Sequence, residues 1–519
     1  MLNLNFDNQF TARLPDDGIA ENYRRQLQQA IYSRVAPTPV SGPHLIAHAT
    51  EVAQMIGLDE ATIESDAFVQ VFAGNQVLPG MDPHATCYGG HQFGNWAGQL
   101  GDGRAINLGE VNVGEQHYML QLKGAGPTPF SRTADGLAVL RSSVREFLCS
   151  EAMHHLGVPT TRALCLIGTG EDVVRDMLYD GNPQAEPGAV VCRVSSSFVR
   201  FGHYQLLAAR QELDLLRQFT DFVIQREFPE QAALKDDRER WLAWFAEVAQ
   251  RTATLMVHWM RVGFVHGVMN TDNLSILGET IDYGPYGWLE DFDPDWTPNT
   301  TDAGQRRYRY GQQPGIAQWN LLQLGNALLP LIEDPKPLEE VLSGFARTYE
   351  QAWQQMMADK LGLNQYVPQL NSQLMQLLTR AETDMTLFYR ALAKVDLNNP
   401  TNTDPLDAAY YETGALSGQL KDDLITWLED YGQALSEQNI SRQAQTQRMN
   451  QTNPKYVLRN YLAQLAIDDA EQGDFQRVRE TLQVLRHPYD EQPEFEEYAA
   501  KRPEWARTRV GCSMLSCSS

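Results

Sequence analysis

The chain has 519 residues, of which 42 are Lys or Arg and 66 are Asp or Glu, so its formal net charge at pH 7 is −24. This acidic balance argues against broad binding to nucleic acids or to anionic membranes, because both carry negative charge themselves. No run of residues is long and apolar enough to cross a bilayer. A chain of this length is expected to fold into more than one structural unit.

The order of the sequence patterns predicts four regions. An N-terminal extension of helices and loops, with helices expected over residues 21–33 and 44–55, precedes a strand-rich region with one prominent helix. A larger helical region follows, and then a second helical region that ends in a Cys-containing tail. The four regions are residues 1–85, 86–205, 206–332 and 333–519.

A glycine-rich turn at residues 101–104 is followed by two apolar runs, 105–111 and 118–123, that an Asn/Gly turn joins. This pattern predicts a β-hairpin. Lys123 ends the second run and shares a face with Gln121, because side chains alternate along a strand. A glycine turn lets backbone N–H groups approach phosphates, so Lys123 is a candidate phosphate ligand. The alternative is a solvated lysine at a strand end.

Apolar residues recur at spacings of three to five over residues 137–153, which predicts a helix that ends near Gly157. Glu146 lies at the edge of its apolar stripe and could reach Lys123. Protein kinases fix their nucleotide-binding lysine with such a helix-borne glutamate. The alternative is a solvated Glu146 paired with a neighbouring arginine such as Arg145.

Residues 190–201 begin as an apolar strand and carry Arg193 and Arg200. Guanidinium groups bind phosphate oxygens bidentately and stay charged, so the two arginines are candidates for holding the outer phosphates of a nucleotide. The alternative is a pair of surface arginines. Residues 180–188 are rich in Gly, Asn and Pro and predict a mobile turn just before this strand.

The most informative segment is residues 266–273, His-Gly-Val-Met-Asn-Thr-Asp-Asn, which a long predicted helix precedes. Protein kinases use H-R-D-x-x-x-x-N followed by D-F-G, and here Asn273 and Asp282 occupy the metal-binding places of that pattern. Val268 stands where the catalytic Asp should be and cannot accept a proton. Asp272 supplies a carboxylate from another place in the loop. Without other support, an Asp-Asn pair would indicate only a surface turn.

Six cysteines in a chain of this length do not indicate a disulfide-stabilised scaffold. Four of them lie in apolar surroundings and are expected in the core. Cys512 and Cys517 lie in a small, polar tail and are the candidates for redox reactivity. Zinc binding is not expected, because a zinc site would need two further ligands near these two cysteines and the sequence has none there.

Several ordered strings resemble the selenoprotein O family, whose bacterial members are protein adenylyltransferases with a pseudokinase fold. The resemblance runs from about Phe6 to the end of the chain. The strings that carry it are residues 88–94 (Tyr-Gly-Gly-His-Gln-Phe-Gly), 99–105 (Gln-Leu-Gly-Asp-Gly-Arg-Ala), 122–132 (Leu-Lys-Gly-Ala-Gly-Pro-Thr-Pro-Phe-Ser-Arg), 135–136 (Asp-Gly), 266–273 and 517–519 (Cys-Ser-Ser).

The resemblance implies an α+β, protein-kinase-like two-lobed fold with an N-terminal extension and additional C-terminal helices. It also implies ATP bound in a flipped orientation, a Mg²⁺ or Mn²⁺ ion, and transfer of AMP to Ser, Thr or Tyr hydroxyls of proteins. Glu146 would orient Lys123, and Asp272 would accept the hydroxyl proton. Asn273 and Asp282 would hold the metal. Contacts to ATP are implied for Gly101, Gly103, Arg104, Lys123, Asp135, Gly136, Arg193, Arg200 and Asp282.

Other functions remain open at this point: a kinase with Asp272 as a displaced base, transfer of UMP, or an inactive scaffold that senses nucleotide. Retention of Lys123, Glu146 and Asp282 argues against the scaffold. Family members can join a C-terminal Cys to a Cys of the activation segment, but no Cys occurs between residues 282 and 332 here. The first residues have neither a signal-peptide nor a transit-peptide pattern, so we expect a bacterial cytoplasmic protein.

Overall fold

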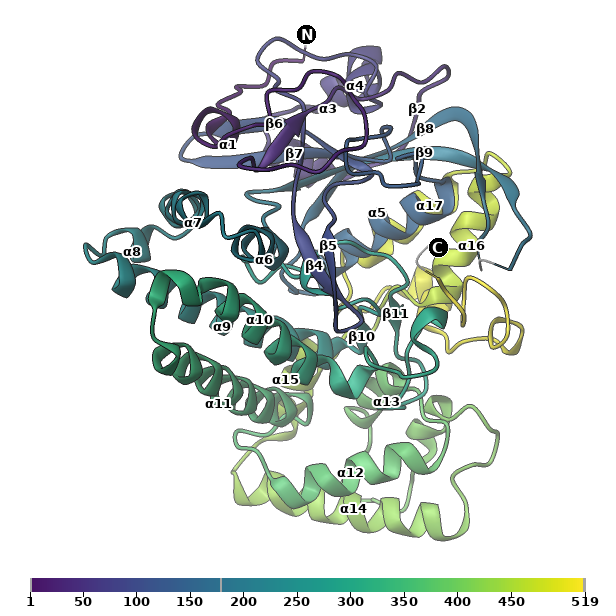
Figure 1. Cartoon of the computed structure of the whole chain (residues 1–519). Coiled ribbons are helices and arrows are strands. Elements are labelled where there is room, and N and C mark those ends of the chain that lie inside the picture. The colour runs from purple at the N-terminus through teal and green to yellow at the C-terminus, as the bar shows by residue number, and fades with distance from the viewer. Residues whose placement is uncertain (1, 178–179, 517–519) are drawn as a thin grey trace.

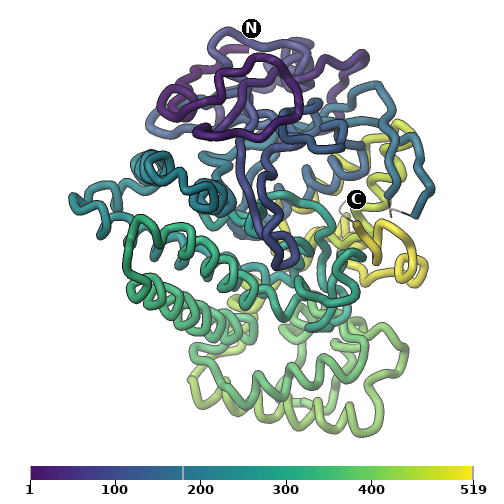
Figure 2. The backbone as a smooth tube through the Cα atoms, viewed as in Figure 1, coloured from purple at the N-terminus to yellow at the C-terminus, as the bar shows by residue number. Residues whose placement is uncertain are grey.

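The computed structural model describes residues 2–177 and 180–516. A sheet-rich region, mostly from the first 200 residues, lies above a larger helical region (Figure 1). The last part of the chain runs back up beside the sheet-rich region, so that residues from both ends of the chain lie near one another there (Figure 2). The mixture of helices and sheet confirms the predicted α+β class.

The largest sheet has seven strands in the order β1-β3-β6-β7-β9-β8-β2, and every neighbouring pair is antiparallel. The smaller sheets are the pairs β4-β5 and β10-β11. The strands are β1 (Tyr32–Arg34), β2 (His44–His48), β3 (His84–Thr86), β4 (Gly89–Gln92), β5 (Asn95–Gln99), β6 (Ala105–Val113), β7 (Gln116–Lys123), β8 (Arg162–Arg175), β9 (Gln184–Ser195), β10 (Phe264–Val265) and β11 (Gly287–Trp288).

The predicted hairpin is confirmed as β6 and β7, with Ala105 opposite Lys123. Register with the next strand places Gln121 opposite Arg193, so these two side chains and Lys123 lie on one face of the sheet. Helix α5 (Leu140–His155) packs on that face. The other face is covered by α2 (Thr50–Met55), α3 (Glu60–Ile63) and α4 (Asp66–Phe72).

The helix expected over residues 21–33 is wrong, because the segment is irregular until β1 begins. The four-residue spacing of the buried Leu27 and Ile31 imitates a helix, but local backbone donors find other partners. The N–H of Leu27 donates to Gln99 Oε1 at 2.9 Å, and that of Gln29 donates to a glutamate at 3.0 Å. Residues 44–55 form strand β2 and helix α2 instead of one helix.

The prediction of a mobile turn over residues 180–188 is also wrong in part. A bend remains at 180–181, but Gln184 already begins strand β9, and Pro187 lies opposite Asp172 of β8. Pairing with a long neighbouring strand overrides the turn preference of Gly and Pro here.

The helical region is built around α9 (Asp237–Val262), which confirms the long helix expected before the loop at 266–273. Asp236 caps its first turn, and Gly263 ends it with a left-handed φ of 76°. Residues 291–312 form loops and short 3-10 turns. The other helices of the first 332 residues are α1 (Gln9–Arg13), α6 (Phe201–Ala209), α7 (Leu213–Glu227), α8 (Pro229–Ala232), α10 (Gln313–Ile332) and the 3-10 helices η1 (Thr271–Asn273), η2 (Thr300–Asp302) and η3 (Tyr310–Gln312).

The C-terminal residues are mostly helical, as predicted. One bundle with its own apolar core lies below the rest of the molecule, and α16 and α17 pack against α5 beside the large sheet (Figure 1). In the described part of the chain, no helix could span a membrane. The helices are α11 (Pro335–Lys360), α12 (Pro368–Arg380), α13 (Met385–Leu392), η4 (Asp404–Ala409), α14 (Gly418–Glu437), α15 (Arg442–Thr452), α16 (Asn460–Glu471), α17 (Gln476–Leu485), η5 (Pro493–Ala499) and η6 (Glu504–Ala506).

Candidate active site

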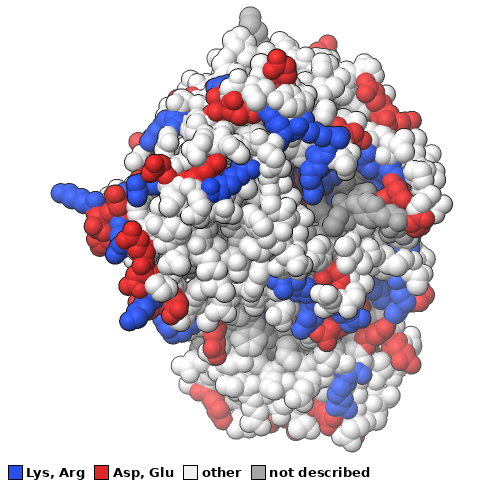
Figure 3. All heavy atoms as spheres, viewed as in Figure 1, with Lys and Arg blue, Asp and Glu red and all other residues white. Residues whose placement is uncertain are grey.

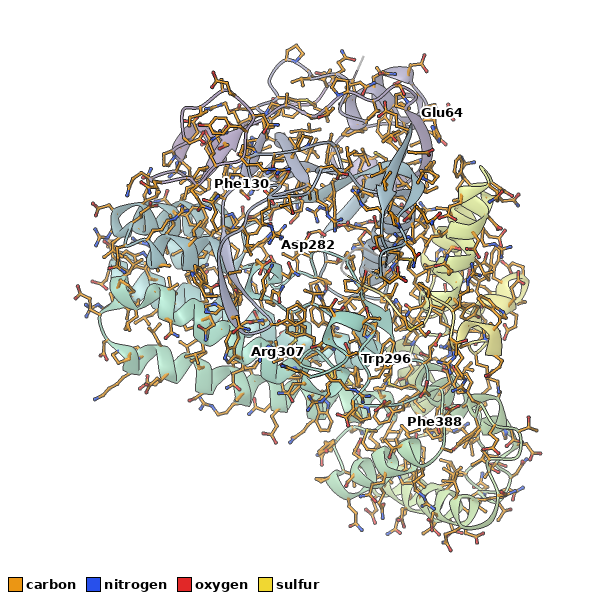
Figure 4. The ribbon with its side chains drawn as sticks, turned by 45° about the vertical axis from the view of Figure 1, so that its right-hand side comes forward. Glu64, Phe130, Asp282, Trp296, Arg307 and Phe388 are labelled. Atoms are coloured by element: carbon orange, nitrogen blue, oxygen red, sulfur yellow. The ribbon has the colours of Figure 1, made fainter. Side chains whose placement is uncertain are left out.

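A pocket of about 650 Å³ lies between the sheet-rich and the helical regions. Asp282 points into this space, below Phe130 of the sheet-rich region (Figure 4). The structure brings together in this pocket the predicted proton acceptor Asp272 and every residue that the sequence predicted to contact nucleotide or metal: Gly101, Gly103, Arg104, Lys123, Asp135, Gly136, Arg193, Arg200, Asn273 and Asp282.

Lys123 forms an ion pair with Oε2 of Glu146, which settles the choice between a paired and a solvated glutamate. Arg193 binds the other carboxylate oxygen of Glu146 at 3.1 Å. Burial lowers the pKa of Lys123 to about 8, with the charges of Arg104 and Arg193 adding to the effect and Glu146 opposing it. A further anion in the pocket would therefore stabilise the charged form of Lys123.

Asp282 is held between Arg193 and Arg200. Arg193 Nη1 lies 2.6 Å from its Oδ1, and Arg200 pairs with its Oδ2. Burial would raise the pKa of Asp282, but the two guanidinium groups outweigh it and hold this pKa well below the ordinary value. Asp282 also has a left-handed φ of 57°, a conformation that costs energy for a residue other than glycine and is frequent at functional sites.

Asp272 lies in η1 at the edge of the pocket and is only 7% exposed. Gln92 Nε2 donates to its Oδ2 at 3.3 Å, and Arg200 donates to its backbone carbonyl at 2.9 Å. Its Oδ1 has no hydrogen-bond partner among the described residues. Burial raises the pKa of Asp272 to about 6. A carboxylate with such a pKa can take up a proton near neutral pH, whereas Val268 in the same pocket cannot.

Asn273 and Asp282 fit a hard divalent cation. The Nδ2 of Asn273 donates to the carbonyl of Val268 at 3.0 Å, so its Oδ1 is the atom that could bind a cation. His266 hydrogen-bonds the carbonyl of Ile281 at 2.8 Å and so ties the loop to the residue before Asp282. Within the described residues, no group of three or more His, Cys, Asp or Glu could hold a metal alone. Mg²⁺ bound to one carboxylate completes its shell with phosphates and water.

The glycine-rich turn is held by Asp102, whose Oδ2 accepts hydrogen bonds from the N–H and the hydroxyl of Thr86 at 2.9 and 2.6 Å. Gly101 has a φ of 113°, and a Cβ there would lie 2.6 Å from the ring of Phe130. Only glycine fits this position. Asp135, which also lines the pocket, forms an ion pair with Arg175 at 2.7 Å.

Three residues of the site were not identified from the sequence. Asp102 and Gln92 lie inside strings that carried the family resemblance, and this position was the sequence signal that could have identified them as site residues. Arg175 comes from the far end of β8, and no local pattern marks it.

The cysteine predictions have a mixed outcome. The four cysteines expected in the core are buried, as predicted: Cys87, Cys149, Cys165 and Cys192. Cys512 is buried as well, and burial raises its pKa to about 11, which opposes the predicted reactivity of this thiol. Cys517 lies outside the described residues.

A family model described as Protein adenylyltransferase SelO matches residues 20–486. The chain belongs to the SelO family. It is 59% identical to a protein nucleotidyltransferase YdiU of Azoarcus sp. (strain BH72), and the match covers 99% of both chains. Proteins of the same name from Aromatoleum aromaticum and Rhodopirellula baltica are 57% and 55% identical, over 100% and 99% of each chain. As a SelO family member, the chain is an enzyme of the nucleotidyltransferase class, and its substrate is a nucleotide.

Proposed function

We propose that this SelO family enzyme transfers AMP from ATP to Ser, Thr or Tyr hydroxyls of proteins, and that ATP lies flipped relative to its orientation in protein kinases. One observation carries the proposal. The kinase base position holds the apolar Val268, whereas the buried carboxylate of Asp272 shares a pocket with Lys123, Arg193 and Arg200. A kinase-like fold is part of this proposal.

The three cations would hold the two outer phosphates. Pyrophosphate would then be the leaving group, and fixed positive charge would stabilise it as it departs. The acceptor hydroxyl would lose its proton to Asp272 as it attacks the α-phosphate. Asn273 and Asp282 would hold Mg²⁺ or Mn²⁺, which supplies charge neutralisation between the phosphates.

Phosphates and Asp282 compete for the same two guanidinium groups. Arg193 and Arg200 are each 2% exposed, and both form ion pairs with Asp282. When phosphates take over this role, the oxygens of Asp282 become available to a cation. Nucleotide and metal are therefore expected to enter together.

Parallel reactions with α-labelled and γ-labelled ATP and a broad set of protein acceptors test the proposal. Label from the α-position is expected on protein, and label from the γ-position is expected in pyrophosphate. Incorporation of γ-label would establish a kinase with Asp272 as a displaced base. No transfer of either label would support the nucleotide-sensing scaffold, and a preference for labelled UTP would establish UMP transfer.

Replacing Glu146 by glutamine is expected to weaken ATP binding about 10-fold, because Lys123 loses the anion that orients it. The dissociation constant for Mg²⁺–ATP, measured by titration calorimetry, gives the result. Glu115→Gln is the matched control, since Glu115 is an exposed residue in the turn of the hairpin that carries Lys123. Equal affinities of the two variants would show that the Lys123–Glu146 pair does not orient the lysine.

A further inference from the structure

The hairpin β4-β5 is not explained by the proposed chemistry, although its Tyr-Gly-Gly-His-Gln-Phe-Gly string is one of those that stood out in the sequence. It is separate from the large sheet and extends down towards the helical region, alongside η1 and α6 (Figure 1). Residues 88–93 thus lie about 180 positions before the loop that they touch.

The hairpin backbone binds the two residues that precede Asp272. The N–H of His91 donates to the hydroxyl of Thr271 at 2.7 Å, and the N–H of Phe93 donates to Oδ1 of Asn270 at 3.1 Å. Both acceptors are buried. These two buried hydrogen bonds therefore fix the position of the hairpin relative to the loop.

Asp272 itself receives a side-chain contact from the same hairpin. Gln92 Nε2 donates to Oδ2 at 3.3 Å, and both residues line the pocket. Gly90 lies against the other side of the carboxylate, since a Cβ on Gly90 would be 2.5 Å from Oδ1 of Asp272. The carboxylate is thus enclosed by β4, with one oxygen hydrogen-bonded and the other without a partner within the described part of the chain.

We propose that Gln92 is a positioning residue that binds Oδ2 of Asp272 and so holds the carboxylate in the orientation from which it accepts the proton of the acceptor hydroxyl. This inference rests on the proposed role of Asp272 as the proton acceptor. A neutral amide suits the task, because it fixes the carboxylate without the full charge of a Lys or Arg. A cationic donor at this place would stabilise the ionised carboxylate and make it a weaker base.

Gln92→Ala is expected to lower kcat for AMP transfer about 10-fold and to leave KM for ATP unchanged, because only the orientation of the base is lost. Asn95→Ala is the matched control, an amide removed from the exposed end of the same hairpin, and it is expected to keep full activity. If the alanine variant folds poorly, Gln92→Met replaces it as the test. Methionine fills similar space without a donor, and the same loss of kcat is expected. Full kcat in a folded Gln92→Met variant would overturn the proposal.

A double-mutant cycle separates this inference from the proposed function. If Gln92 acts through Asp272, Gln92→Ala is expected to cause no further loss in an Asp272→Asn background. An additional 10-fold loss in that background would overturn the positioning role while leaving Asp272 as the base. Full activity of Asp272→Asn alone would refute the proposed proton acceptor, and the role of Gln92 with it.

Discussion

Asp282→Ala is expected to lose transfer activity by at least about 10²-fold and to be less stable than the parent protein. Asp282 is the proposed metal ligand, and it is also the shared counter-ion of the buried Arg193 and Arg200. Removing one partner of a buried ion pair typically costs about 3–5 kcal/mol. Arg193 keeps Glu146, so the lower end of that range is expected. Steady-state transfer and chemical denaturation measure the two losses.

Asp282→Asn separates the two effects. The amide keeps the shape and one acceptor oxygen for the arginines, but it is a poor metal ligand, so activity should be lost with less destabilisation. Asp422→Ala, on the exposed face of α14, is the control for an ordinary surface carboxylate. Full activity of Asp282→Ala, or activity that EDTA does not change, would remove this residue from the metal site.

Asp272→Ala is expected to reduce kcat by about 10²-fold or more, the usual range for loss of a general base, while ATP binding is largely kept. Among the residues that the structure describes, only Gln92 hydrogen-bonds the side chain of Asp272, so little of the nucleotide-binding wall depends on it. Rapid-quench transfer and equilibrium ATP binding are the two measurements. A variant that loses ATP binding to the same extent as transfer would assign Asp272 to the binding of substrate.

Asp272 also predicts how the transfer reaction depends on pH. The pKa of Asp272 is raised to about 6, and the base is the deprotonated form. The value of kcat/KM for the parent protein should therefore rise with pH through about 6, because this ratio reports the groups of the free enzyme, and it should fall again near pH 8, where Lys123 loses its charge. A flat profile through that interval, at constant ionic strength, would contradict the assignment.

Side-chain periodicity was sufficient to predict a contact where both residues of the pair lie in a regular helix or strand. Alternation along β7 predicted the face of Lys123, and helical spacing placed Glu146 within its reach, so the sequence alone could predict the pair. Figure 3 shows acidic and basic residues interspersed on the visible face.

Local pattern failed where long-range contacts decide the conformation. Residues 21–31 follow an irregular path because side chains from distant segments satisfy their backbone donors. Gln92 carries no local sign of its contact with Asp272, since the two lie 180 positions apart. Cys512 looked exposed in a polar tail, but it packs in a small apolar cluster with residues such as Tyr456 and Tyr461.

The packing of α16 and α17 on α5 has a consequence for biosynthesis. The helix that carries Glu146 is covered by segments translated more than 300 residues later, and Arg479 of α17 donates to the carbonyl of Ile46 in β2 at 2.9 Å. On the ribosome, α5 is therefore made long before the helices that cover it. A nascent chain is therefore expected to stay inactive until α16 and α17 have left the exit tunnel, which keeps copies without these helices from modifying the proteins around them.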